Sequence, residues 1–413
     1  MRVLAITKIF PNALDPHYAP YNRQQFAELA RRCDLHVLAT IPSFPGARWA
    51  RRWSAIGKLT AVPDQETISG IQVRHPRTWF VPKLPGLSLP LYVASLARAV
   101  LPMRGLIDAV FATWAYPDGC AAVALAEALG VPAVVKVHGS DINCVSALRG
   151  PRYWMKRWLP RASRVIAVSR ALGGRLAELG VPRDRIEVVL NGVDTSVFFP
   201  RDRQACRAAL GLPEERKLIV YVGRVTREKG VLDLLEAFDR IAPVRPDVDL
   251  AIVGVGGASG ACERARERHP GRVWLAGNQS LDGVAAWLGA SDVHTLPSWN
   301  EGTPNCVLEA LASGRRVVAT RVGGVPDLVD LPELGQLVQA RSPGALAQAL
   351  VQAIDVRYDP AQVVAASAAT SWHQNGERVF DLLRSAVREK TAMSSRASAE
   401  PARGSRPSLS EGG

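Results

Sequence analysis

Apolar positions recur along the chain in two kinds of stretch, short β-rich runs and longer runs of helical period. In the first half, RVLAIT (2–7) and LHVLATI (35–41) alternate with helical patterns such as NRQQFAELARR (22–32) and DGCAAVALAEALG (118–130). Near-continuous apolar strands separated by amphipathic helices are typical of a parallel sheet covered on both faces. The first half is therefore predicted to be a Rossmann-like α/β domain.

The alternation stops at NGVDTSVFFPRD (191–202), which carries turn residues, and a second series starts at KLIVYVG (217–223). A second doubly wound domain is the natural prediction, with the boundary in the interruption. Helical patterns close the fold and are expected to cross back to the first domain. The predicted parts are residues 1–195, 196–360, 361–390 and 391–413.

The last part is rich in Ser, Ala, Pro, Arg and Gly and almost lacks large apolar residues. Such a segment cannot offset its own ordering entropy, so residues 391–413 are predicted to form a disordered tail. The chain as a whole, 47% hydrophobic and 22% charged, has the composition of an ordinary globular protein.

Basic residues are unevenly placed. The net charge is +13, and residues 1–200 carry 25 Lys and Arg against 13 Asp and Glu. This excess favours an anionic partner. No helix-turn-helix, RNP or zinc-finger pattern is present, so nucleic acid is not expected as the partner.

Six cysteines are scattered without a CxxC pair, which predicts reduced thiols in the cytoplasm. The most apolar long window, 84–103, is interrupted by prolines and an arginine and fails as a membrane span.

Candidate chemistry is densest in SWNEGTPNCVLEALASG, where Thr303 is expected to cap a helix of about ten residues that Gly314 ends. Glu301 lies just before this helix and Glu309 within it. The amino end of a helix presents unpaired N–H groups that suit a phosphate. From spacing alone, both acids could equally be ordinary surface residues.

Two further groups follow predicted strands. Arg224 and Lys229 lie in YVGRVTREKG, at the strand end where open α/β sheets bind ligands, and they suit a diphosphate. The alternative is that they are solvated loop cations. His138 and Asp141 in KVHGSD follow another strand, although a lone histidine there is more often structural.

Other motifs fail on inspection. GVGGASG (254–260) lacks the third glycine of a dinucleotide fingerprint, and neither GxxxxGK[ST] nor HExxH occurs. DVD at 247–249 leads directly into an apolar strand and is interpreted as a strand entrance. No metal site is predicted.

Taken together, the segments NGVD (191–194), VGRVTREKG (222–230) and EGTPNCVLE (301–309) resemble, in this order, the retaining GT-B glycosyltransferases of family GT4 (glycosyltransferase group 1), among them bacterial cell-surface polysaccharide glycosyltransferases. The resemblance covers about residues 1–385. It implies two Rossmann-like doubly wound parallel-sheet domains facing a cleft, and a hexosyltransferase (EC 2.4) that uses a nucleotide diphosphate sugar as co-substrate and no cofactor.

Residue roles come from the same resemblance. It implies that Arg224 and Lys229 hold the donor diphosphate, that Glu309 binds the ribose and that Glu301 binds the transferred sugar, which His138 approaches from the other domain. The implied catalytic residues are Glu301, His138, Arg224 and Lys229, and the implied donor site is Arg224, Lys229, Glu301, Gly302, Thr303, Pro304, Asn305 and Glu309.

The loop after the first strand, KIFPNALDPHYAPYN (8–22), departs from the family because it lacks glycine. Its contacts cannot be carried over. The acceptor-side candidates are Asn12, His17, Asn22 and Asp141.

The sequence thus predicts a retaining, metal-independent glycosyltransferase acting on a lipid-linked glycan acceptor. The alternatives are a nucleotide-sugar 2-epimerase of the same fold and a transferase with a soluble acceptor.

Segments 46–58 and 149–164 interleave Trp with Arg or Lys, which predicts docking on the anionic inner face of the plasma membrane. The alternative is that they are solvated basic helices or loops that pack a few aromatics inward.

Overall fold

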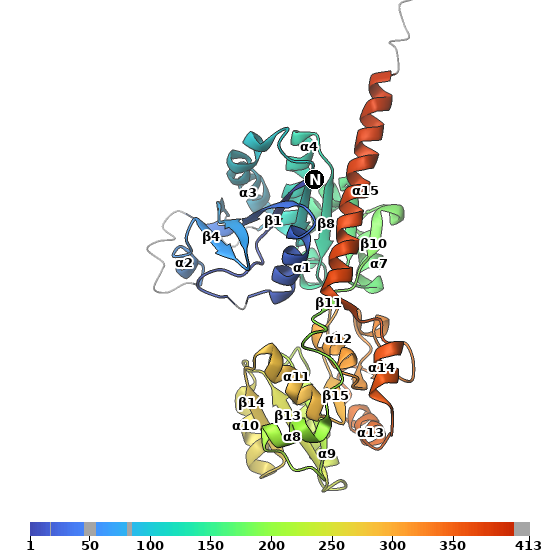
Figure 1. The fold of residues 1–413 in the computed structure, drawn as a ribbon. Helices are drawn as coiled ribbons and strands as arrows, with labels where there is room; N and C mark the ends of the chain where they lie inside the picture. The colour runs from blue at the N-terminus through green and yellow to red at the C-terminus, as the bar shows by residue number, and fades with distance from the viewer. Residues whose placement is uncertain (17, 45–54, 81–84, 400–413) are drawn as a thin grey trace, which may run out of the picture.

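The computed structural model describes residues 1–16, 18–44, 55–80 and 85–399, and it has two lobes joined near β11 (Figure 1). The first lobe is built on an eight-stranded sheet in the order β10-β9-β8-β7-β1-β2-β5-β4. All neighbours are parallel except the β4–β5 hairpin. The strands are β1 (Arg2–Thr7), β2 (Asp34–Ala39), β4 (Gln65–Ile68), β5 (Ile71–Arg74), β7 (Ala109–Thr113), β8 (Ala133–Val137), β9 (Arg164–Ala167) and β10 (Ile186–Val188).

Helices cover both faces of this sheet, because its central strands are apolar on both sides. A short pair, β3 (Ile41–Ser43) and β6 (Arg77–Trp79), lies beside it. The helices of the lobe are α1 (Pro20–Ala30), α2 (Ala55–Leu59), α3 (Pro85–Val100), α4 (Cys120–Leu129), α5 (Ser140–Asn143), α6 (Arg149–Trp158) and α7 (Arg170–Glu178).

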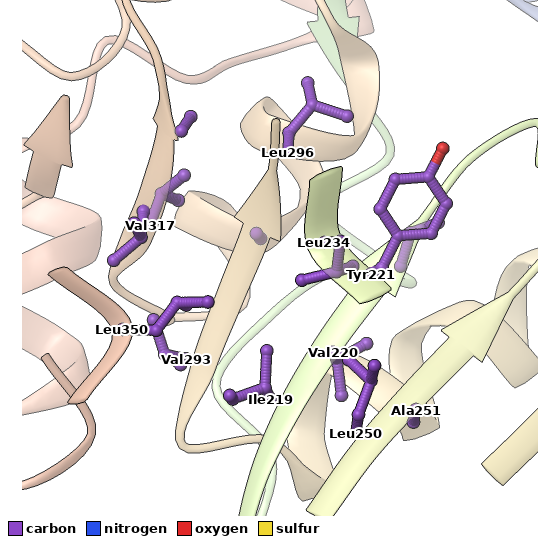
Figure 2. Packing of buried hydrophobic residues seen from close by; sticks show 14 of the residues in the cluster. Ile219, Val220, Tyr221, Leu234, Leu250, Ala251, Val293, Leu296, Val317 and Leu350 are labelled. Carbon is purple, nitrogen blue, oxygen red and sulfur yellow. The ribbon is translucent and has the colours of Figure 1, made fainter. Parts of the chain in front are cut away.

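The second lobe carries an all-parallel six-stranded sheet in the order β14-β13-β12-β15-β16-β17. Its core packs strand residues such as Ile219, Val293 and Val317 against helix residues such as Leu234 and Leu350 (Figure 2). The strands are β12 (Lys217–Val222), β13 (Val248–Val253), β14 (Val273–Gly277), β15 (Val293–Leu296), β16 (Val317–Thr320) and β17 (Gly335–Val338). The helices are α8 (Arg203–Leu210), α9 (Val231–Ile241), α10 (Ser259–Arg268), α11 (Leu281–Ala290), α12 (Asn305–Ala312), α13 (Pro343–Ile354) and α14 (Pro360–Ala366).

The chain crosses between the lobes twice, and the two crossings pair with each other. Strand β11 (Gly192–Val193) lies parallel to β18 (Thr370–Ser371). A Cβ at Gly192 would lie 2.6 Å from the Cα of Trp372, so this close approach requires glycine. Helix α15 (Trp372–Ala399) then runs along the first lobe (Figure 1). Its apolar residues, Val379, Leu382, Leu383 and Ala386, join the core formed by α1 and the sheet.

The tail differs from the sequence prediction. Helix α15 continues to Ala399, so residues 391–399 are helical where a disordered tail is expected. Its serine and threonine hydroxyls donate to carbonyls four residues earlier, as from Thr391 to Val387 and from Ser395 to Thr391. A helix that is already formed extends at little cost through residues such as Ala, Met and Arg. Residues 400–413 lie outside the described residues.

The apolar window at 84–103 mostly forms α3, with Pro90 inside the helix. Within the described ranges, none of the helices combines the length and the hydropathy needed to span a bilayer.

Candidate active site

A cleft of about 760 Å³ lies where the two lobes face each other. It opens at the carboxyl ends of parallel strands, where polar residues follow β8 in one lobe and β12 in the other. Its lining is Ile9, Tyr18, Ala19, Pro20, Tyr21, Trp114, His138, Ser140, Asn191, Val222, Gly223, Arg224, Lys229, Leu296, Glu301, Thr303, Pro304, Asn305, Cys306 and Glu309.

Two cations come from the loop between β12 and α9. The Tyr221 hydroxyl donates to the Arg224 carbonyl at 2.8 Å and fixes the turn, while the Arg224 side chain is exposed. Lys229 lies at the end of the loop, and its Nζ contacts Glu301 Oε1 at 2.6 Å. This ion pair is partly shielded, since Glu301 is buried, so it holds the lysine in place inside the cleft.

Glu309 lies on α12 and is partly buried in the cleft wall. Burial raises the pKa of its carboxyl to about 7, because the charged form loses hydration. A carboxyl with this pKa can accept hydrogen bonds from hydroxyls or, when protonated, donate one.

Helix α12 begins differently from the sequence prediction. The N-cap is Pro304, and no side chain among the described residues caps the helix. Thr303 does not cap it, since its hydroxyl donates to the Val168 carbonyl of the first lobe. The helix covers eight residues, Asn305–Ala312, and Gly314 follows its end with φ of 69°. Its first N–H groups are therefore available to a ligand in the cleft.

His138 enters the cleft from the loop after β8. Asp141 accepts hydrogen bonds from the backbone N–H groups of His138 and Gly139 and so shapes this loop. The ring centroid of Tyr21 lies 4.9 Å from that of His138. Burial and the nearby charge of Lys136 hold the pKa of His138 well below its usual range, so the imidazole is neutral at physiological pH.

The loops of His138 and Glu301 meet through glycine backbone. A Cβ at Gly302 would lie 2.0 Å from the His138 carbonyl oxygen, and one at Gly139 would lie 2.7 Å from the Gly302 Cα. Only glycine allows this approach, which brings the two lobes together at the centre of the cleft.

None of the described acceptor-side candidates, Asn12, Asn22 and Asp141, lines the cleft itself. Asn12 accepts from Leu14 and Asp15 in a local turn and lines a separate pocket. Asn22 is fully buried and donates to Ile9 and Thr113, and Asp141 is fully buried in its loop. His17 lies outside the described residues.

Sequence reasoning misses several residues of the cleft, chiefly Tyr18, Tyr21, Trp114 and the side chain of Asn191. Trp114 directly follows β7, so the rule that ligands bind at strand ends could have found it. The two tyrosines come from the glycine-free loop and the first turn of α1, and they have no motif of their own.

The DVD segment lies away from the cleft residues. Asp249 accepts from Arg216 at the start of β13, and Asp247 pairs with Arg245. Across the described part of the chain, no group of three or more His, Cys, Asp and Glu is arranged to hold a metal ion.

Two Rossmann-like domains that face a cleft define the GT-B class of glycosyltransferases. Residues 21–197 match the family model for Glycosyltransferase Family 4, and residues 216–355 match that for glycosyl transferases group 1. The chain is 30% identical over 387 residues to TuaC of Bacillus subtilis (strain 168), covering 92% of this chain and 95% of TuaC, whose name assigns it to teichuronic acid biosynthesis. It is 28% identical over 329 residues to a D-inositol 3-phosphate glycosyltransferase of Paenarthrobacter aurescens (strain TC1), covering 74% and 80% of the two chains.

Solved structures agree on the fold. The crystal structure of HepE from Anabaena in complex with UDP has a TM-score of 0.65 and 17% identity, covering 97% of this chain and all of that one. The chain therefore belongs to the family 4 glycosyltransferases, and it is a transferase of the GT-B fold. The family prediction is confirmed, and membership favours transfer over the epimerase alternative.

Proposed function

We propose that this glycosyltransferase moves a hexosyl group from a nucleoside diphosphate sugar to a glycan acceptor in cell-surface polysaccharide synthesis, with retention and without a metal ion. One observation carries the proposal: the cleft sets Arg224, Lys229 and the start of α12 opposite His138. The names of TuaC, a teichuronic acid biosynthesis glycosyltransferase, and of the HepE complex with UDP support the substrate classes.

In this mechanism the bond between the anomeric carbon and the phosphate oxygen breaks first, and its electron pair leaves with the diphosphate. Arg224, Lys229 and the N–H groups of α12 stabilise that charge. The acceptor oxygen bonds to the same face of the anomeric carbon and passes its proton to the leaving phosphate. Glu301 and neutral His138 bind hydroxyls of the sugar.

The acceptor of this proposal is lipid-linked, and the enzyme works at the inner face of the plasma membrane. Helix α6 supports this, because Arg152, Tyr153, Lys156 and Arg157 are exposed while Met155 packs into the core. Basic side chains near an anionic surface contribute about 1 kcal/mol each. Residues 46–54 of the other segment lie outside the described residues.

The test begins with a panel of UDP, GDP, ADP and TDP sugars. The true donor should raise the unfolding temperature, because a ligand that binds only the native state stabilises it by RT ln(1 + [L]/Kd). Transfer to lipid-linked glycans is then assayed, and NMR of the product reads the anomeric configuration.

Retained configuration and activity that survives EDTA are expected. An inverted product would contradict the mechanism, and activity restored only by a divalent ion would contradict metal independence. If no nucleotide sugar protects or reacts, the proposed function is wrong.

A further inference from the structure

A buried lysine lies beside the cleft and outside the mechanism above. Lys136 is on β8 and is 1% exposed. Among the described residues it forms no ion pair, and its Nζ donates instead to two amide oxygens, Gln25 Oε1 at 3.2 Å and Asn191 Oδ1 at 3.0 Å. Burial lowers the pKa of this amine to about 7. An unpaired buried amine is costly to keep, so its retention needs an explanation.

The explanation lies in the direction of the hydrogen bonds. A lysine ammonium has donors and no acceptor, so Asn191 must turn its oxygen toward Lys136. The Asn191 amide nitrogen then points the other way and donates to Asn305 Oδ1 at 3.0 Å. With its oxygen directed at Asn191, Asn305 has its Nδ2 donors left to offer the cleft.

Asn305 is the first residue of α12 and lines the cleft. Its amide donors therefore add to the free N–H groups of the same helix turn. A group of donors at one place suits the oxygens of a phosphate or a sugar. If the amide of Asn191 were reversed, Asn305 would turn an acceptor toward those oxygens.

A second branch ties the lysine to both crossings of the chain. Gln25 of α1 accepts from Lys136 and donates to Asn375 Oδ1 at 2.8 Å, and Asn375 of α15 donates to the Leu190 carbonyl. Leu190 immediately precedes Asn191 at the first crossing. The backbone that carries Asn191 is thus held by the same network.

We infer that Lys136 is a positioning residue of the donor site: through Asn191 it sets the direction of the Asn305 amide, so that Asn305 donates to the oxygens of the bound nucleoside diphosphate. The inference rests on the proposed function, because it requires a donor nucleotide in the cleft. Lys136 would thus act on the donor site without touching the substrate itself.

A double-mutant cycle tests it. The probe is whichever of UDP, GDP, ADP and TDP most raises the unfolding temperature of the wild type, and Kd is measured by calorimetry. Lys136→Met is expected to raise Kd about tenfold, as is Asn305→Ala, and the double variant should exceed Asn305→Ala by no more than about twofold. Lys136→Gln, which keeps an amide donor, should recover Kd to within about threefold of the wild type.

Arg207 provides the matched control. It is another buried cation at 1% exposure, but it pairs with Asp292 and does not line the cleft. Arg207→Met is expected to lower the unfolding temperature and to leave Kd at the wild-type value. Combined with Asn305→Ala, it should leave Kd at the value of Asn305→Ala alone. Equal Kd changes in the two cation variants would overturn the inference, because both would then reflect lost stability.

A second variant covers the case in which Lys136→Met does not fold. Asn191→Asp keeps the acceptor for Lys136 and removes the donor to Asn305, so it should raise Kd and be non-additive with Asn305→Ala. If the fold-change in Kd of a double variant equals the product of the fold-changes of its two single variants, the residues act independently. That result would overturn the inference, while the proposed function would stand. A wild type that binds none of the four nucleotides would overturn both.

Discussion

Lys229 shows how a single side chain is fixed by a partner distant in sequence. Its ion pair with Glu301 places the ammonium within the cleft at 2.6 Å from a buried carboxylate. The ion pair with Glu301 restricts the rotamers of Lys229, so if the proposed donor site is right, less side-chain entropy is lost when a diphosphate binds.

Lys229→Ala is therefore expected to lower kcat/KM at least about tenfold, or about 1.4 kcal/mol of transition-state stabilisation. Steady-state kinetics with the identified donor measures the effect. Arg240→Ala is the control, since Arg240 pairs with Glu236 on the exposed face of α9. Near wild-type kinetics in a folded Lys229→Ala variant would remove this residue from the donor site.

Glu309 makes a prediction about stability as well as activity. In the folded protein its carboxyl stays protonated up to about pH 7, whereas in the unfolded chain it ionises near its ordinary pKa of 4.5. The folded state then binds more protons between these values, so the stability from this group is complete below pH 4.5 and is lost as pH rises through about 7.

Glu309→Gln should therefore stabilise the nucleotide-free enzyme at pH 8, on the order of 1–2 kcal/mol, and change little at pH 4.5. At pH 8, where Glu309 is ionised, it should also lower kcat/KM at least about tenfold, because in the proposed donor site a neutral amide binds ribose hydroxyls less well than a carboxylate. Thermal unfolding of both proteins at the two pH values checks the first part. A variant that is less stable than the wild type at pH 8 would contradict the cause assigned to the raised pKa.

At the level of elements, α15 is the part whose packing partners are farthest away along the chain. It follows the second lobe in sequence, but Val379 and Leu383 complete the core of the first lobe against α1. The first lobe thus depends on residues nearly 200 positions beyond its last strand.

Leu383→Ala is expected to destabilise the protein by about 2–5 kcal/mol, since it removes a fully buried side chain from a packed core. Denaturant unfolding followed by circular dichroism measures the change. Deletion of residues 391–413 is the control, because residues 391–395 are exposed. A deletion that lowers the unfolding temperature by several degrees would show that the end of the helix has packing partners.

For the whole molecule, the position of its charge predicts where it works. The exposed cations of α6 lie on the first lobe, which also carries most of the excess positive charge. Interactions of such groups with anionic lipid fall off within a Debye length, about 10 Å at 0.1 M salt.

The wild type should therefore co-sediment with phosphatidylglycerol vesicles at low salt and not with phosphatidylcholine vesicles. Lys156→Ser with Arg157→Ser should weaken this binding, while Arg264→Ser with Arg266→Ser on α10 should not, although both pairs remove two charges. If the wild type ignores anionic vesicles, or both variants bind equally, a solvated helix and a soluble acceptor become the better interpretation.

The sequence predicted most of the elements and the strand ends at which the candidate site lies. Alternating apolar runs and helical patterns predicted the two parallel sheets, because the direction of each side chain follows from local backbone geometry. Arg224 and Lys229 could be placed after β12 for the same reason. The family's ordered motifs then gave the class of enzyme.

Which of these residues come into contact depends on the tertiary structure. Lys229 forms an ion pair with Glu301, which is 72 positions away in the sequence. The Thr303 hydroxyl donates to the Val168 carbonyl of the other lobe instead of capping α12. In the sequence, Lys136 is one of many cations in the first half of the chain. The fold buries it and places it within hydrogen-bond distance of Gln25 and Asn191. Such contacts depend on how distant segments pack, and local periodicity carries no record of that packing.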